Sequence, residues 1–313
     1  MRRPAVLAVV GPTASGKSAT AELVAERLGT SVVSVDAMQV YRGMDVGTAK
    51  TPACERRVPL LMVDVCDPLE NYSVSLFQRD ARACVDALLS GGRDAVLCGG
   101  TGLYLDAVID EMEFPSGEKG GERRRAYEGL LAERGPAALH DLLAERDPRS
   151  ARLIHPNNSR RVVRALEMLD EGTSYAEHHE GLLARKPHYE AGIWGLTMSR
   201  ERLYARIDRR VDEMFASGLV DEVRTLAARG LTSELTAGQA IGYKEVLEAL
   251  SGACAMSDAV EQVKVRTRRY AKRQLSWLRR DGRVRWIDLD GCDVEAAAER
   301  IVNDVCREEH GTL

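Results

Sequence analysis

The feature of this sequence that most constrains its fold is an eight-residue loop at Gly11–Ser18, which reads Gly-Pro-Thr-Ala-Ser-Gly-Lys-Ser. It fits the phosphate-loop pattern G-x-x-x-x-G-K-[ST] at every fixed position. The apolar run 5–10 before it predicts a buried strand, and residues 19–28 after it predict a helix that ends at Gly29. A strand, a glycine-rich loop and a helix in this order are the context in which the motif binds phosphate, so the sequence predicts a phosphate site.

The residue types in this loop suit a phosphate ligand. The two glycines allow the backbone to wrap so that its N–H groups point at phosphate oxygens, and the helix N-terminus adds positive potential. Lys17 supplies a mobile cation, and the Ser18 hydroxyl can ligate Mg²⁺. The residues that we expect around the phosphate are Gly11, Thr13, Ala14, Ser15, Gly16, Lys17 and Ser18.

Short apolar runs and helical patterns alternate through much of the chain. This alternation is typical of a parallel sheet covered by helices on both faces, so we predict an α/β fold with a P-loop NTPase-like parallel sheet. The later strands are predicted at 32–35, 60–63, 95–98, 193–197 and 284–288. The later helices of this sheet domain are predicted at 75–89, 200–216, 218–229, 242–250, 257–280 and 293–307.

The pattern changes near residue 114, where a stretch rich in glycine and charge begins. From there to about residue 190 the segments are charged and helix-like, with few β-branched runs. We therefore predict a mostly helical insertion domain over 118–190, within a catalytic core formed by 1–117 and 191–313. The chain has 313 residues, 44% hydrophobic and 29% charged, which is enough for this division.

The apolar runs and the cysteines indicate where in the cell the protein is located. No apolar run approaches the length of a membrane span. The seven cysteines contain no C-x-x-C pair and their closest spacing is twelve residues, which favours free thiols in a reducing compartment. The sequence therefore predicts a cytoplasmic protein without a membrane partner.

Positive charge is concentrated in two segments, although the net charge is −4. Residues 264–285 contain ten lysines and arginines and one acid, and a second segment carries Arg149, Arg152, Arg160, Arg161 and Arg164. Such segments form either a surface that faces a polyanion or solvated helix faces paired with acids elsewhere in the fold. Charge alone does not choose between these two interpretations.

Two residues near predicted strand ends are candidates for chemistry. Asp36 follows the second strand, where a carboxylate could act as a general base or metal ligand, or could cap a helical turn. Thr101, in the turn Gly99–Gly102 after another strand, could donate a hydrogen bond to developing charge. In parallel sheets the carboxyl ends of the strands meet at one edge, so we expect both residues on the side of the phosphate loop.

Three further features have weaker signals. Asp64 ends an apolar run and could complete a Mg²⁺ site, but a structural role is favoured. Arg224 lies on a predicted amphipathic helix, where its local pattern indicates a surface residue. The turn Gly238–Lys244 could stack on a nucleic-acid base or could simply join two helices.

Together these segments resemble the tRNA dimethylallyltransferase (isopentenyltransferase) family of the bacterial type, from about residue 7 to 280. The resemblance rests on the phosphate loop joined to six other segments. These segments are 34–50, 64–68, 99–104, 155–161, 241–244 and 268–278.

The resemblance implies transfer of the dimethylallyl group from dimethylallyl diphosphate to N6 of the adenosine beside the tRNA anticodon. It implies that Asp36 is the general base, that Thr101 orients the reacting centre and that Arg224 contacts the diphosphate. The phosphate loop with Mg²⁺ would hold the leaving group, and the insertion would grip the anticodon stem-loop. The implied tRNA contacts are Asp36, Ala37, Met38, Gln39, Thr101, Arg123, Arg160, Arg161, Val162, Val163, Arg164, Gln239, Ala240, Ile241, Gly242, Tyr243 and Lys244.

Two other functions remain as alternatives. A small-molecule kinase with the same core would bind ATP and transfer a phosphoryl group, but it would leave the basic segment at 264–280 without a role. A non-catalytic RNA-binding regulator would not need the intact Lys17 and Ser18. We expect the protein to be a monomer.

Overall fold

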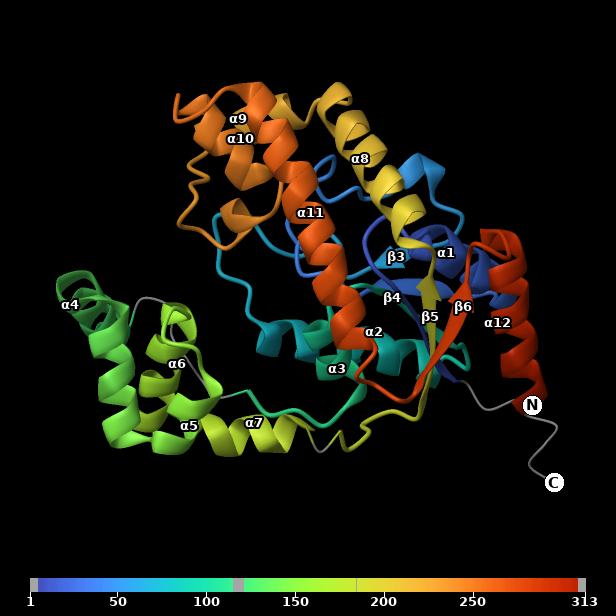
Figure 1. The fold of residues 1–313 in the computed structure, drawn as a ribbon. Helices are drawn as coiled ribbons and strands as arrows, with labels where there is room; N and C mark the ends of the chain where they lie inside the picture. Colours follow the sequence, from blue (N-terminus) through green and yellow to red (C-terminus); the bar gives the residue numbers. More distant parts are fainter. Residues whose placement is uncertain (1–4, 115–120, 184, 309–313) are drawn as a thin grey trace. The chain divides into compact units, whose positions relative to one another are not determined.

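The centre of the fold is a six-stranded, fully parallel sheet with the order β3-β2-β4-β1-β5-β6 (Figure 1). We describe it from a computed structural model that covers residues 5–114, 121–183 and 185–308. The first strand in the chain, β1, lies in the middle of the sheet, so the loop that follows it has neighbouring strand ends on both sides. The strands are β1 Val6–Val10, β2 Ser31–Ser34, β3 Leu60–Leu61, β4 Ala95–Gly99, β5 Ala191–Thr197 and β6 Val284–Asp288.

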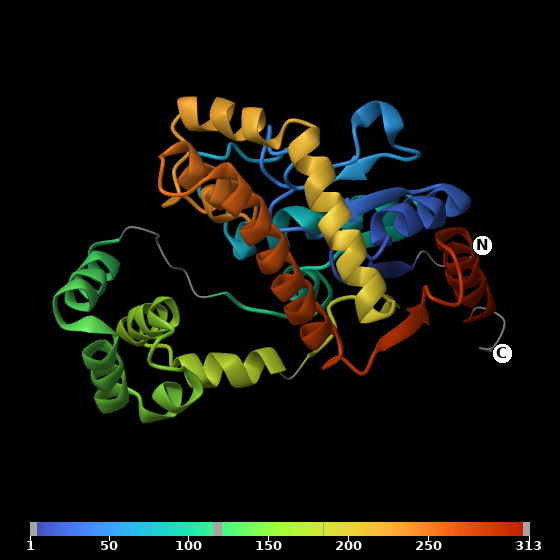
Figure 2. The same cartoon turned by 45° about the horizontal axis from the view of Figure 1, so that its top comes forward.

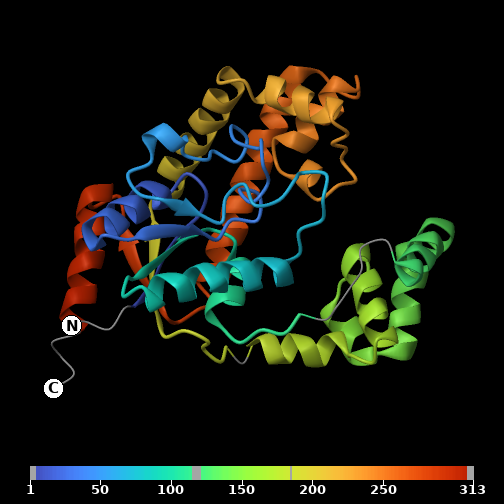
Figure 3. The ribbon, with the colours of Figure 1, turned by 180° about the vertical axis from the view of Figure 1, so that it is seen from behind.

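Helices cover both faces of this sheet because side chains along each strand alternate between the faces. On one face, Ala8 and Leu97 share a hydrophobic core with α2 (Val74–Ser90) and α3 (Gly102–Ile109). On the other face, Val9 and Val96 pack with α1 (Lys17–Leu28), α8 (Arg200–Ala216) and α12 (Val294–Glu308). Figure 3 shows α2 lying across the sheet when the molecule is seen from behind.

The other helical elements of the sheet unit follow β2 and β5 in the chain. The longest is α11, which packs against both α8 and α10 (Figure 2). These elements are η1 Ala53–Glu55, α9 Leu219–Ala228, η2 Ala237–Gln239, α10 Tyr243–Leu250 and α11 Met256–Leu278. Within the described ranges, no helix combines the length and apolar character that spanning a membrane requires.

In a second unit, the described secondary structure is mostly helical and surrounds its own core. Its helices are α4 Glu122–Arg146, α5 Pro148–Leu153, α6 Ser159–Asp170 and α7 Tyr175–Leu183. Leu139 and Leu143 of α4 pack against Val162 and Leu166 of α6. The α4 helix kinks at Gly135, whose φ of 80° lies in the left-handed region that a residue without a Cβ adopts readily.

The structure separates this unit, made of the described residues of 110–187, from the unit of 1–109 and 188–313. The sequence placed the boundaries at 117/118 and 190/191, and the first of these lies outside the described residues. The fold class, a parallel P-loop NTPase-like sheet with a helical insertion, is confirmed.

The predicted element bounds agree closely for α8 and β6, which begin and end at the expected residues. The strand predicted over 60–63 is the clearest difference. It ends after Leu61 because Met62 and Asp64 have φ values of 60° and 58°, which are incompatible with extended backbone.

Candidate functional site

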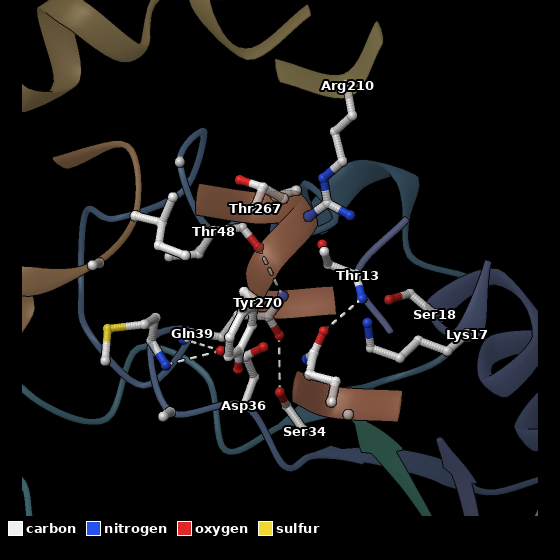
Figure 4. Close-up of a pocket in the computed structure, with 18 of the residues that line it drawn as sticks. Thr13, Lys17, Ser18, Ser34, Asp36, Gln39, Thr48, Arg210, Thr267 and Tyr270 are labelled. Atoms are coloured by element: carbon white, nitrogen blue, oxygen red, sulfur yellow. Dashed lines mark hydrogen bonds between the residues drawn. The ribbon is translucent and has the colours of Figure 1, made fainter. Parts of the chain in front are cut away.

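A cavity of about 330 Å³ opens at the carboxyl edge of the sheet (Figure 4). The phosphate loop, the segment after β2 and helices α8 and α11 all contribute to its wall. Lys17, Asp36, Arg210 and Tyr270 line it, although they come from four separate parts of the chain. This arrangement confirms that Asp36 and the phosphate loop lie at one edge, as the parallel topology predicts.

The loop has the backbone geometry of a phosphate cradle. Ala14 and Gly16 have φ values of 62° and 97°, so the chain turns sharply before α1 begins. A Cβ on Gly11 would lie 2.7 Å from Ser15 Oγ, which explains the glycine at that position. Among the described residues, Ser15 Oγ is a buried side-chain oxygen without a hydrogen-bond partner, and such an atom is normally satisfied by a ligand or water.

Positive charge gathers next to this loop. A second cavity, of about 370 Å³, touches Lys17 and Ser18 and is lined by Arg206, Arg209 and Arg210 of α8. Burial lowers the pKa of Lys17 and of Arg210, and the proximity of Arg210 lowers that of Lys17 further. Crowded, desolvated cations of this kind are stabilised when an anion binds between them.

Asp36 is held by the backbone that follows it. Its Oδ1 accepts hydrogen bonds from the backbone N–H groups of Met38, at 2.9 Å, and Gln39, at 3.3 Å. The carboxylate therefore stabilises the turn that follows it, and the same side chain lines the cavity. The two bonds use one carboxylate oxygen, and they fix the direction of the whole group.

Helix α11 makes polar contacts with the site that the sequence did not predict. The buried Gln274 accepts a hydrogen bond at 2.9 Å from the backbone N–H of Thr13 in the phosphate loop. One helical turn earlier, the Tyr270 hydroxyl lies 3.3 Å from Thr101 Oγ1. The signal that could have revealed Gln274 is its position as an amide on the otherwise apolar stripe of a basic helix.

The glycines of the Thr101 turn are required by the same helix. A Cβ on Gly100 would lie 2.2 Å from Gln274 Nε2, and a Cβ on Gly102 would lie 1.9 Å from the ring of Trp277. Trp277 also donates a hydrogen bond at 3.0 Å to Asp106 in α3. The turn is therefore packed directly against α11, and this contact fixes the backbone around Thr101.

The structure does not support the predicted role of Arg224. Its side chain is 59% exposed, it pairs with Asp221 on the same helix, and it lines neither cavity. Arg210 is the arginine that extends from α8 toward Thr13 and Lys17 (Figure 4). The local interpretation of Arg224 as a surface residue agrees with this geometry, and Arg210 is the arginine that lines both cavities with Lys17.

Several residues expected to contact tRNA have side chains that cannot do so. Val162 and Val163 are 0% and 2% exposed in the core of the helical unit. Tyr243 is fully buried, and its hydroxyl donates to Glu222. The prediction that the side chains of Val162, Val163 and Tyr243 contact tRNA is therefore wrong, because the amphipathic pattern of each helix turns these positions inward.

Other residues from the same prediction are placed where a ligand could reach them. Gln239, Ala240 and Ile241 line the cavity together with Ala37, Met38 and Gln39. Gly242 instead donates its backbone N–H to Glu245, and Lys244 approaches Glu248 at 3.8 Å.

In the helical unit, Arg160 and Arg161 are exposed at the start of α6. Arg123 is also exposed and donates to the carbonyl of Asp170. Arg164 approaches Glu167 at 3.7 Å.

In the basic segment 264–285, some cations pair with acids within the fold and others remain on the surface. Arg268 forms a bidentate salt bridge with Asp208, at 2.8 and 2.6 Å. Arg266 pairs with the buried Glu245 at 2.5 Å. By contrast, Arg269 and Lys272 are exposed. Part of the charge therefore stabilises the fold, and part remains on the surface.

A parallel sheet with an intact phosphate loop after β1 and a polar cavity at the same edge defines an α/β protein of the phosphate-loop class. A family model described as IPP transferase matches residues 39–281, and one described as isopentenyl transferase matches residues 4–57. This chain belongs to the IPP transferase family.

Individual relatives agree with this assignment. The tRNA dimethylallyltransferase of Streptomyces griseus is 46% identical over 91% of this chain and 90% of its own length. That of Geobacillus kaustophilus is 44% identical over 95% and 94%.

Two solved structures extend the comparison to the fold. The tRNA isopentenylpyrophosphate transferase from Bacillus halodurans has a TM-score of 0.70 at 39% identity, over 99% of this chain and 100% of that one. A eukaryotic dimethylallyltransferase acting on tRNA has a TM-score of 0.80 at 27% identity, over 98% of this chain and 80% of that one.

Proposed function

We propose that this protein transfers the dimethylallyl group from dimethylallyl diphosphate to N6 of the adenosine next to the anticodon in tRNA. The observation that carries the proposal is that Asp36 and the phosphate loop line one cavity. A base and a leaving-group site are thereby brought together. The names of the relatives, which are tRNA dimethylallyltransferases, support the same reaction.

The diphosphate would lie between the phosphate loop and α8. Lys17 and Arg210 would neutralise the charge that develops on the leaving oxygens, and backbone N–H groups of the loop would add hydrogen bonds. Because these cations are already desolvated, their interaction with an anion is stronger than it would be in water. Loss of diphosphate from an allylic carbon is favoured by such charge neutralisation.

In the reaction, the bond between C1 of the dimethylallyl group and the diphosphate oxygen breaks, and its electron pair leaves with the diphosphate. The N6 lone pair forms the new bond to C1, and Asp36 takes the proton released from N6. Thr101, held near Tyr270, would orient the reacting centre. The amine of adenine is a weak nucleophile, since its lone pair is delocalised into the ring, so removal of the proton matters.

The loop residues also fit the Mg²⁺ that this proposal includes. Ser18 lies at the start of α1, lines both cavities and is exposed, so its hydroxyl is accessible to an ion. Ser18 would hold the ion through its hydroxyl oxygen. When bound, Mg²⁺ would supply further neutralisation of the diphosphate charge.

The tRNA would present its adenosine on the side of the cavity formed by 37–39 and 239–241. A base in a stacked loop must leave its stack to enter a pocket of this kind. Exposed arginines such as Arg160 and Arg161 would contact phosphates, which gives affinity without reading sequence. We further propose that the protein is a monomer and that it is cytoplasmic. The cytoplasmic location is consistent with seven cysteines that form no disulfide.

The test is an incubation with tRNA, Mg²⁺ and either labelled dimethylallyl diphosphate or labelled ATP. Label transferred to tRNA from the prenyl donor is the expected result. Label transferred from ATP to an acceptor would instead identify a kinase. No transfer from either donor, with tRNA binding intact, would identify a non-catalytic RNA-binding protein.

A further inference from the structure

Three consecutive backbone N–H groups in the loop after Met44 converge on one carboxylate. Glu222 Oε2 accepts from Asp45 and Val46, each at 2.8 Å, and Oε1 accepts from Gly47 at 3.1 Å. Glu222 belongs to α9, which is distant in sequence from this loop. Hydrogen bonds to a charged acceptor are stronger than neutral ones, so the carboxylate is a firm attachment point.

Tyr243 completes this attachment from α10. Its hydroxyl donates to Glu222 Oε1, and its ring lies close against the loop at Gly47. A Cβ on Gly47 would be 2.3 Å from the ring, so the contact requires a glycine. Since Tyr243 is fully buried, the ring cannot move aside without disturbing the core.

The loop attached in this way forms part of the cavity wall. Gly47, Thr48 and Ala49 line the cavity, and the carbonyl of Thr48 accepts a hydrogen bond at 3.2 Å from Gln39 Nε2. Ser34 Oγ donates to Gln39 Oε1 at 2.8 Å, so the amide is held at both ends (Figure 4). The backbone N–H of the same Gln39 donates to Asp36. Contacts thus run from Glu222 through the loop to the proposed general base.

Lys50, which follows the loop, makes a separate set of contacts that includes Asp45 at the start of the loop. The buried Lys50 donates to the carbonyl of Tyr41 at 2.6 Å and pairs with Asp45 and Asp64 at 2.8 and 2.6 Å. This structural role for Asp64 agrees with the one that its sequence context favours. Because Lys50 does not depend on Glu222, loss of Glu222 should loosen residues 45–49 without unfolding the surrounding structure.

We propose that Glu222 and Tyr243 are positioning residues for the acceptor, acting through the loop 45–49 to hold Gln39 and Asp36 against the incoming adenosine. The proposal rests on the function given above. Among the described residues, the hydrogen bonds that link Glu222 to Asp36 involve neither the phosphate loop nor Arg210, although Ala49 also lines the second cavity. Loss of the Glu222 attachment should therefore lower kcat/KM for tRNA and leave binding of the prenyl donor unchanged.

The experiment compares Glu222→Gln with Tyr243→Phe and with a matched control, Asp221→Asn. Glutamine keeps the shape of the side chain but replaces one accepting oxygen with a donor, which cannot bond to the converging N–H groups. Phenylalanine removes one hydroxyl and keeps the ring over Gly47. Asp221 is adjacent and exposed, and its change removes the same charge without touching the loop.

Two measurements are made on each variant. Hydrogen exchange of the amides at 45–47 reports the attachment directly, and we expect it to accelerate about tenfold or more in Glu222→Gln. Steady-state kinetics should show a fall of about tenfold or more in kcat/KM for tRNA, with KM for dimethylallyl diphosphate within about twofold of wild type. Tyr243→Phe should lie between Glu222→Gln and wild type, and Asp221→Asn should match wild type in both measurements.

The outcomes distinguish a positioning role of Glu222 from a general effect on stability and from failure of the proposed function. Unchanged kcat/KM for tRNA in Glu222→Gln would overturn the positioning role, as would faster exchange spread over the whole sheet. An equal loss in KM for the prenyl donor would also overturn it. If wild-type protein transfers nothing, the proposed function fails on its own, and the positioning role fails with it, while the exchange data still decide whether Glu222 holds the loop.

Discussion

Two arginines on neighbouring helices provide a direct test of how the leaving group is held. Arg210 extends from α8 into both cavities beside Lys17, whereas Arg224 on α9 is exposed and pairs with Asp221. Truncation of each to alanine removes the same charge from the same fold. We expect Arg210→Ala to weaken diphosphate binding strongly and Arg224→Ala to leave it unchanged.

The magnitude follows from the type of bond that is lost. A hydrogen bond from guanidinium to a charged acceptor contributes about 1.5–3 kcal/mol, which corresponds to about 10- to 150-fold in binding. The folded protein should tolerate the change, because burial lowers the pKa of Arg210 and so disfavours its charged form before the anion binds. Exposed ion pairs such as that of Arg224 contribute about 1 kcal/mol or less.

The assay is calorimetric titration with inorganic diphosphate and Mg²⁺, together with KM for dimethylallyl diphosphate. Arg210→Lys serves as the control that keeps the charge but loses the planar fork, and it should recover part of the affinity. Diphosphate affinity that is unchanged in Arg210→Ala, or reduced equally by Arg224→Ala, would refute the assignment made from the geometry.

Three further changes test other parts of the site. Asp36→Asn should nearly abolish the chemical step in single-turnover measurements while tRNA binding persists in a filter assay, and near-normal turnover would contradict the general-base role. Gln274→Leu leaves the Thr13 N–H without its acceptor, so KM for the prenyl donor should rise by about five- to 100-fold. An unchanged KM would show that this hydrogen bond is not needed for donor binding. Gly102→Ala places a methyl group 1.9 Å from the ring of Trp277, so thermal melting should fall by several degrees, for a loss of about 1–3 kcal/mol; unaltered melting would show that the ring can move.

The elements that sequence reasoning placed well are those with a strong local pattern. The bounds of α8 match because its apolar spacing and the residues at its ends are both contained in one short segment. The strand at 60–63 was overestimated, because left-handed backbone at Met62 and Asp64 gives no signal in an apolar run. The valines of α6 were misassigned for a related reason, since the face that turns inward depends on the helices packed against it.

By itself, the sequence determined the phosphate loop, the parallel sheet that presents it and the position of Asp36 at the same edge. These features follow from turn chemistry and periodicity within about twenty residues. Tertiary structure alone decided that Arg210 and not Arg224 faces the loop, that Gln274 binds Thr13 across 261 residues, and that Glu222 anchors Asp45 across 177. Local pattern cannot specify such pairs, because they exist only where separate helices pack at one edge of the sheet.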